Sequence, residues 1–297
     1  MRKRNWKEYN RQLVQRGSLT FLIDPRLFTP KQTKRSKKQG RPQEFSDQLI
    51  IMLMIVKIHY RLSYRMLEGF IASLLAFKKR LTIFPSYSLI CKRAANLKEA
   101  LPKLSSRRPS VVILDASGVK VYGEGEWKVK IHGKKNPRKW VKIHIAIDAQ
   151  SQEIVAVATT NSRVKDGKVT EALLNQVPRS VRKVLADGAY DGQHSREEIR
   201  KRGAQALIPP PRNARCWGKD QNRDDAVKVI RALGGDKEAK SLWGKLIGYS
   251  RRSLVETTFS RMKRLFGERL FSKIFDKQII ENGLRALLLN RLLRLSV

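Results

Sequence analysis

The chain has 297 residues and a formal net charge of +37, because it holds 63 lysine and arginine residues against 26 aspartate and glutamate residues. Such an excess favours a polyanionic partner, since the self-repulsion otherwise only destabilises the compact state. The longest apolar run, residues 49–56, is far shorter than the roughly 20 residues that cross a bilayer, which argues against a membrane-spanning protein. The basic N-terminus lacks the apolar stretch of a signal peptide, and Cys91 and Cys216 lack disulfide or zinc spacing. We therefore expect a cytoplasmic, nucleoid-associated protein.

Both parts of the chain are basic, which favours a long polyanion gripped by the whole protein over a charged tail. Residues 1–108 hold 25 basic and 6 acidic side chains, and residues 109–297 hold 38 and 20. DNA or RNA fits this distribution best, and an anionic membrane surface is the second candidate.

Residues 1–108 are predicted to form an all-helical domain. Within it, residues 31–41 contain six basic side chains and no apolar one, which indicates a solvated basic linker. Three segments have apolar residues at helical spacing behind a serine N-cap: 46–60 with Ser46, 62–77 with Ser63, and 85–101 with Pro85 and Ser86. Three short helices ending in a basic one resemble a helix-turn-helix, whose last helix enters a DNA groove. A small bundle that only packs on the rest of the chain is an equally good interpretation.

Residues 109–297 are predicted to form an α/β domain. The pattern predicts strands at 111–121, 140–148, 153–160, 181–187 and 204–210, and helices at 166–177, 195–203, 248–267 and 279–295. Three antiparallel strands followed by alternating helix and strand indicate a mixed sheet with helices packed on it. The polar stretch 212–240 is predicted to be a long loop, within a short insertion at about 210–245.

Three carboxylates stand out in this second domain. Asp115 interrupts an apolar strand, where a charge is costly unless it is paired or bound to metal. Asp187 ends a later strand at the edge of the sheet where α/β proteins usually place their sites. Glu256 is the one acid in a helical segment with five basic residues. Each has a plain explanation on its own, such as a turn aspartate or an i,i+4 ion pair of Glu256 with Arg252. Together, on a strongly basic protein, they suit Mg²⁺ or Mn²⁺ and phosphoryl transfer.

The segment 248–267 carries a recognisable spacing. Tyr249 is followed after two residues by Arg252, after three more by Glu256 and after six more by Lys263. This pattern resembles the Tyr-x₂-Arg-x₃-Glu-x₆-Lys signature of one branch of bacterial insertion-sequence DDE transposases. Segments 112–133 and 186–191 are similar to the two aspartate regions of that branch, and residues 5–24 to its N-terminal segment.

The resemblance implies a fold, a site and partners. The fold is an RNase H-like catalytic core behind an N-terminal domain that binds the terminal inverted repeats of the element. Asp115, Asp187 and Glu256 would be catalytic and hold two Mg²⁺ ions, for which Mn²⁺ can substitute. Tyr249, Arg252 and Lys263 would bind DNA. The partners would be double-stranded DNA, as element ends and as target, and a second copy of the chain in a synaptic homodimer, with no membrane.

Two other functions remain open from the sequence. An RNase H-like nuclease or resolvase would use the same carboxylates without a joining step. An inactive derivative would bind DNA only, as a regulator of its element, although it would not need the complete carboxylate set. We expect structural roles for three further side chains. His144 would occupy a surface or sheet position. Trp217 and Trp243 would pack in the core, with stacking on an unpaired base as their alternative role.

Overall fold

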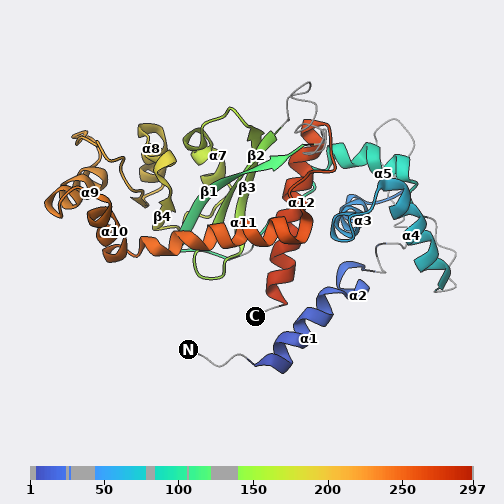
Figure 1. The fold of residues 1–297 in the computed structure, drawn as a ribbon. Helices are drawn as coiled ribbons and strands as arrows, with labels where there is room; N and C mark the ends of the chain where they lie inside the picture. The colour runs from blue at the N-terminus through green and yellow to red at the C-terminus, as the bar shows by residue number, and fades with distance from the viewer. Residues whose placement is uncertain are drawn as a thin grey trace, which may run out of the picture. The chain divides into compact units, whose positions relative to one another are not determined.

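The computed structural model describes residues 5–24, 27, 44–77, 84–105, 107–121 and 140–295. The chain divides into two compact units, a helical unit of Met1–Lys103 with Ser272–Val297 and a sheet unit of Leu104–Phe271 (Figure 1). The predicted linker 31–41 lies outside the described residues. In the described part of the chain, no helix is both long enough and apolar enough to cross a membrane.

The sheet unit is built on a mixed five-stranded sheet, as the sequence predicts. The strand order is β3-β2-β1-β4-β5, with β1, β2 and β3 antiparallel and β4 and β5 parallel to β1. The strands are β1 (Val111–Lys120), β2 (Trp140–Asp148), β3 (Ile154–Asn161), β4 (Lys183–Ala186) and β5 (Gln205–Leu207). The helical elements of this unit are η3 (Asp166–Val169), α7 (Thr170–Leu174), η4 (Gly188–Tyr190), α8 (Gln193–Lys201), α9 (Gln221–Ala232), α10 (Lys237–Leu246), η5 (Tyr249–Arg252) and α11 (Ser253–Phe266).

The two faces of the sheet pack against different helices. Val112 and Leu114 of β1 belong to a buried cluster with Leu173 of α7 and Ile199 of α8. Because side chains alternate along a strand, Asp115 points to the opposite face, which α11 crosses (Figure 1). This alternation places the Asp115 carboxylate on the face crossed by the helix that carries Glu256.

The predicted loop at 212–240 is wrong, because most of this insertion is helical. Ala226 and Ile230 of α9 face Ala239 and Trp243 of α10, and these four side chains form a small core of their own. Each pair is spaced by four residues, so a narrow apolar stripe of each helix forms this core. A two-helix hairpin needs few apolar residues, which is why the stretch resembled a polar loop.

The helical unit surrounds one buried helix, α3. All residues from Leu49 to Ile58 are buried, which explains an apolar run without an amphipathic pattern. The expected caps are confirmed, since the hydroxyls of Ser46, Ser63 and Ser86 each accept a hydrogen bond from the first turn of their helix. The helices of this unit are α1 (Trp6–Arg16), α2 (Leu19–Leu22), α3 (Asp47–His59), α4 (Tyr64–Phe77), α5 (Tyr87–Arg93), η2 (Ala94–Asn96) and α12 (Phe275–Arg294).

The C-terminal helix α12 belongs by its contacts to the helical unit. The sequence places it at the end of the second domain, but it packs on α3 and η2. Leu284 and Leu288 of α12 are fully buried, and Glu281 and Arg285 form a buried ion pair of 2.8 Å one turn apart. The helical unit is therefore made from both ends of the chain.

Candidate active site

Asp115 lies on β1, the central strand of the sheet. Its side chain is 13% exposed, and its Oδ1 atom accepts a hydrogen bond of 2.8 Å from the backbone N–H of Ala116. Burial raises the pKa of Asp115, and the negative charges of Asp187 and Glu256 add to the increase, against the Ala116 hydrogen bond and the charge of Arg252. Asp187 and Glu256 thus both lie within electrostatic range of Asp115.

Asp187 directly follows β4, the strand that pairs in parallel with β1. Leu114 of β1 pairs with Ala186 of β4, so Asp115 and Asp187 are the next residues on adjacent strands at the point where β4 ends. The Asp187 carboxylate caps η4 by accepting a hydrogen bond of 3.0 Å from Ala189. The carboxyl ends of neighbouring parallel strands are a common position for active sites.

Arg252 links Glu256 to Asp115. The Arg252 guanidinium donates one hydrogen bond of 2.7 Å to Oε1 of Glu256 and another of 3.4 Å to Oδ2 of Asp115. The expected i,i+4 pair of Arg252 and Glu256 is confirmed. The predicted single helix over 248–267 is wrong at its start, because Tyr249–Arg252 forms a 3₁₀ turn and α11 begins at Ser253.

Tyr249 is engaged within the protein. Its hydroxyl donates a hydrogen bond of 3.0 Å to the carbonyl oxygen of Ala186, the residue before Asp187. Its ring packs against Trp243 with centroids 6.1 Å apart, so Trp243 is a core residue, as expected. Burial is the main cause that raises the pKa of Tyr249 to about 12. The phenol therefore stays protonated and available as a donor at neutral pH.

Lys263 is exposed on α11 and is not brought together with the carboxylates. It lies seven residues after Glu256, which corresponds to about 10 Å along the helix axis. Ser260, between them, is also exposed. The exposed side of α11 thus carries the acid near its start and the lysine near its end.

The donor set suits a divalent metal ion, although the carboxylates are not preassembled as ligands. Carboxylate oxygens are the ligands that Mg²⁺ and Mn²⁺ prefer. Among the described residues, no three His, Cys, Asp or Glu side chains form a group that could hold a metal ion as they stand. Arg252 lies between two of the three carboxylates instead.

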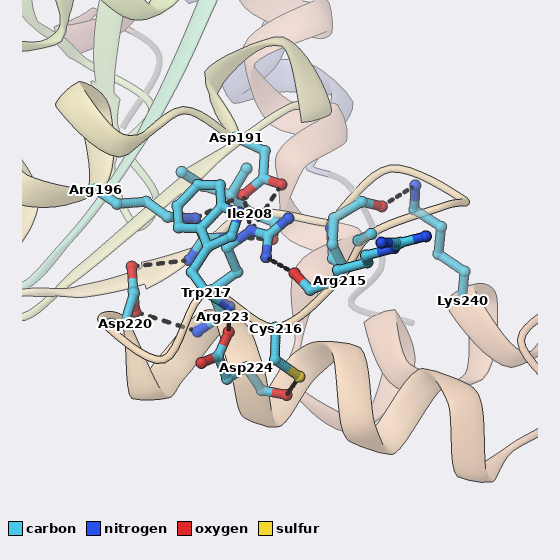
Figure 2. A network of polar contacts seen from close by, with 12 residues as sticks. Asp191, Arg196, Ile208, Arg215, Cys216, Trp217, Asp220, Arg223, Asp224 and Lys240 are labelled. Carbon is cyan, nitrogen blue, oxygen red and sulfur yellow. Dashed lines mark hydrogen bonds and ion pairs between the residues drawn. The ribbon is translucent and has the colours of Figure 1, made fainter.

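Figure 2 shows a buried ion network around Asp191, four residues after Asp187, that the sequence does not predict. The Asp191 carboxylate, only 2% exposed, accepts from Arg196 of α8 at 2.6 Å and from Arg223 of α9 at 3.1 Å. The Arg223 guanidinium also lies 3.7 Å from the ring centroid of Trp217. Asp191 stands within the segment 186–191, but nothing in the spacing indicates a partner 32 residues away.

A second polar cluster lies on the face of the sheet opposite Asp115. His144 is completely buried, and its Nε2 atom lies 2.8 Å from the Thr160 hydroxyl. Asp166 pairs with Lys142 at 2.8 Å and lies 3.9 Å from His144 Nδ1. Burial lowers the pKa of His144 to about 4, although the charge of Asp166 opposes this shift. His144 therefore occupies a sheet position and is neutral at pH 7.

Known proteins resemble this chain over most of its length. An uncharacterised protein of Aquifex aeolicus (strain VF5) is 24% identical over 306 residues, covering 94% of this chain and 84% of that protein. A synaptic complex of piggyBac transposase with hairpin DNA matches with a TM-score of 0.42 and 8% identity over 96% of this chain and 74% of that one. A paired-end complex of Mos1 transposase with the left transposon end matches with a TM-score of 0.24 and 12% identity over 87% and 91%. Both TM-scores are under 0.5.

Two family models match the sequence itself. Both are described as a transposase DDE domain, one over residues 106–291 and the other over residues 14–124. The first spans more than half of the chain and contains Asp115, Asp187 and Glu256. This chain belongs to the transposase DDE domain family.

Proposed function

We propose that this protein is a DNA transposase that binds the terminal inverted repeats of its insertion sequence, cleaves phosphodiesters at the element ends and joins the 3′-hydroxyl ends to target DNA. The observation that carries the proposal is that β1 and the end of β4 hold Asp115 and Asp187 at neighbouring positions, while Arg252 links Asp115 to Glu256 on α11. A sheet of three antiparallel strands followed by two strands parallel to the first supports an RNase H-like core.

The three carboxylates would hold two Mg²⁺ ions, or Mn²⁺ in their place. When bound, such ions lower the pKa of an attacking water and neutralise charge on the attacking and leaving oxygens. Asp115 and Asp187 offer ligands from the rigid sheet. Glu256 offers one from α11. The Glu256 side chain is 56% exposed and therefore accessible to DNA.

The basic residues near Glu256 would hold the DNA. Lys263 is exposed and far enough from Glu256 to reach a phosphate next to the scissile one without entering the metal site. Arg252 offers a guanidinium fork, which suits a phosphate as well as a carboxylate. For Tyr249 we propose a role in positioning Asp187 in addition to the DNA contact that the signature implies, because its hydroxyl is engaged by Ala186.

The helical unit would recognise the inverted repeats through its basic helix α5. Lys92 on this helix is exposed, whereas Arg93 is bound to the Phe45 carbonyl and to Asp47. Lys92 is therefore better placed than Arg93 to reach a phosphate or a base edge. Synapsis of two ends would require a homodimer.

Joining is the reaction that separates a transposase from the alternatives. Full-length protein, labelled element ends, a target plasmid and Mg²⁺ should give cleaved ends and then joined products. Asp115→Asn, Asp187→Asn and Glu256→Gln should each abolish cleavage but bind ends almost normally, because DNA affinity comes mainly from lysine and arginine contacts with phosphates.

Each other result identifies a different function. Cleavage without joining would indicate the nuclease or resolvase, and specific binding without cleavage would indicate the inactive regulator. A carboxylate whose amide variant cleaves within about tenfold of the wild type does not belong to the site.

A further inference from the structure

Arg252 bridges two carboxylates that are far apart in the sequence of the sheet unit. Its two terminal nitrogens point to different partners, Nη1 to Glu256 and Nη2 to Asp115. This arrangement differs from the two parallel hydrogen bonds to one carboxylate that make an arginine pair strong. The Nε atom is buried and has no hydrogen-bond partner among the described residues. The guanidinium is therefore held as a bridging cation rather than in its best hydrogen-bonding geometry.

The oxygen that Arg252 contacts on Asp115 is the one left free for another cation. Oδ1 of Asp115 is occupied by the backbone N–H of Ala116, and Arg252 contacts Oδ2. A metal ion on Oδ2 of Asp115 would lie beside the cationic guanidinium, which would repel it. A guanidinium and a metal ion therefore compete for this oxygen.

The negative charge of the three carboxylates exceeds the single positive charge of Arg252. The three carboxylates carry three negative charges when ionised, and one guanidinium neutralises only one of them. The negative charges that remain repel one another. A divalent cation would relieve this repulsion better than a monovalent one at the same position.

We propose that Arg252 is an internal cation that occupies the metal site until divalent ions displace it, and that the displaced guanidinium then binds a DNA phosphate. This inference rests on the proposed function, since it needs the carboxylates to be metal ligands. Metal binding and DNA binding are then linked, because loading of the metal frees a phosphate-binding group. The Arg252 side chain is 26% exposed and starts at the junction of η5 and α11, so it can turn toward solvent without disturbing the helix.

The test compares Arg252→Ala with Arg251→Ala in the full-length chain. Arg251 is the adjacent residue and is exposed, and its substitution makes the same change in net charge without removing a contact to Asp115 or Glu256. We expect Arg252→Ala to bind Mn²⁺ about tenfold more tightly than the wild type in the absence of DNA, because a competing cation is lost. Arg251→Ala should bind Mn²⁺ within about twofold of the wild type. Mn²⁺ binding is followed by electron paramagnetic resonance of the free ion, which does not depend on activity.

A second readout measures the linkage to DNA. Ca²⁺ should strengthen binding of an element end by the wild type and by Arg251→Ala, and it should do so much less for Arg252→Ala. Arg252→Lys keeps the charge but not the fork, so its Mn²⁺ affinity should lie between those of the wild type and Arg252→Ala. Thermal unfolding with and without Mn²⁺ shows that each variant is folded and that the metal-induced rise in Tm follows the affinity.

The outcomes separate the inference from the proposed function. Weaker Mn²⁺ binding by Arg252→Ala would mean that Arg252 positions Glu256 for the metal, and it would overturn the inference. Equal affinities in Arg252→Ala and Arg251→Ala would overturn it as well. If instead Asp115→Asn binds Mn²⁺ as the wild type does, the proposed metal site itself is wrong.

Discussion

The hydroxyl of Tyr249 donates a hydrogen bond of 3.0 Å to the carbonyl oxygen of Ala186. Ala186 ends β4 and precedes Asp187, so a residue of the turn before α11 holds the backbone that presents a predicted metal ligand. The bond connects the segment that carries Glu256 with the strand that carries Asp187. It gives Tyr249 a structural task that its spacing in the sequence does not reveal.

Tyr249→Phe should reduce cleavage by about tenfold while end binding changes little, because the loss of one hydrogen bond loosens the Asp187 backbone without removing a charge. Single-turnover cleavage and a binding titration measure the two effects. Tyr60→Phe, which removes a hydroxyl that donates to the Gly17 carbonyl in the helical unit, serves as the control. A loss of end binding equal to the loss of cleavage would instead assign Tyr249 to the DNA.

Lys263→Ala should weaken binding of cleaved ends and reduce joining, with metal affinity unchanged. Lys263 is exposed about two helical turns beyond Glu256, so it can contact a phosphate but not a metal ligand. Joining of pre-cleaved ends is measured across Mg²⁺ concentrations, with Lys245→Ala of α10 as the matched control. Full rescue of Lys263→Ala by extra Mg²⁺ would show that the lysine supports the metal site.

Arg223→Met should destabilise the sheet unit by about 3 kcal/mol and reduce cleavage. The substitution leaves the buried Asp191 with one arginine partner instead of two, and breaking a buried ion pair is costly. Urea unfolding gives the stability, and Lys228→Met on the exposed side of the same helix is the control. A stable Arg223→Met variant with normal cleavage would show that the insertion does not support the Asp187 loop.

A fragment that ends near Arg108 should not fold cooperatively by itself. It lacks α12, whose Leu284 and Leu288 are fully buried in the helical unit that surrounds α3. Joining residues 272–297 to this fragment through a flexible linker should restore a cooperative thermal transition. The joined fragment should bind the terminal repeat sequence-specifically, with affinity that falls steeply as salt increases. A cooperative transition of the shorter fragment would contradict this view of α12.

His144→Gln should make the protein less sensitive to acid. The folded-state pKa of His144 is about 4, below its ordinary value of 6.5, so protonation favours the unfolded chain. Wild-type stability should therefore decline from pH 6.5 toward pH 4, by up to about 3 kcal/mol from this group. The variant should lose less over the same range, as measured by urea unfolding at several pH values. His194→Gln at an exposed position should behave like the wild type.

Much of the fold could be predicted because its signals are local. The serine caps at Ser46, Ser63 and Ser86 mark where helices begin, and the alternation in 140–148 predicts a strand that the structure confirms, although both faces of that strand are buried. The helices of the insertion escaped prediction because α9 and α10 need only a few apolar side chains against each other. The start of α11 escaped because a 3₁₀ turn and an α-helix have similar periodicities over four residues.

The sequence by itself determined the types of most elements and the i,i+4 pair of Arg252 with Glu256, since each depends on residues close together in the chain. Only the tertiary structure decided that Arg252 also reaches Asp115, 137 residues away, and that Arg223 reaches Asp191. The same holds for α12, which packs with the N-terminal helices. Periodicity and capping report the local backbone conformation, whereas the partner of a buried charge or an apolar helix face depends on which distant segments the fold brings into contact.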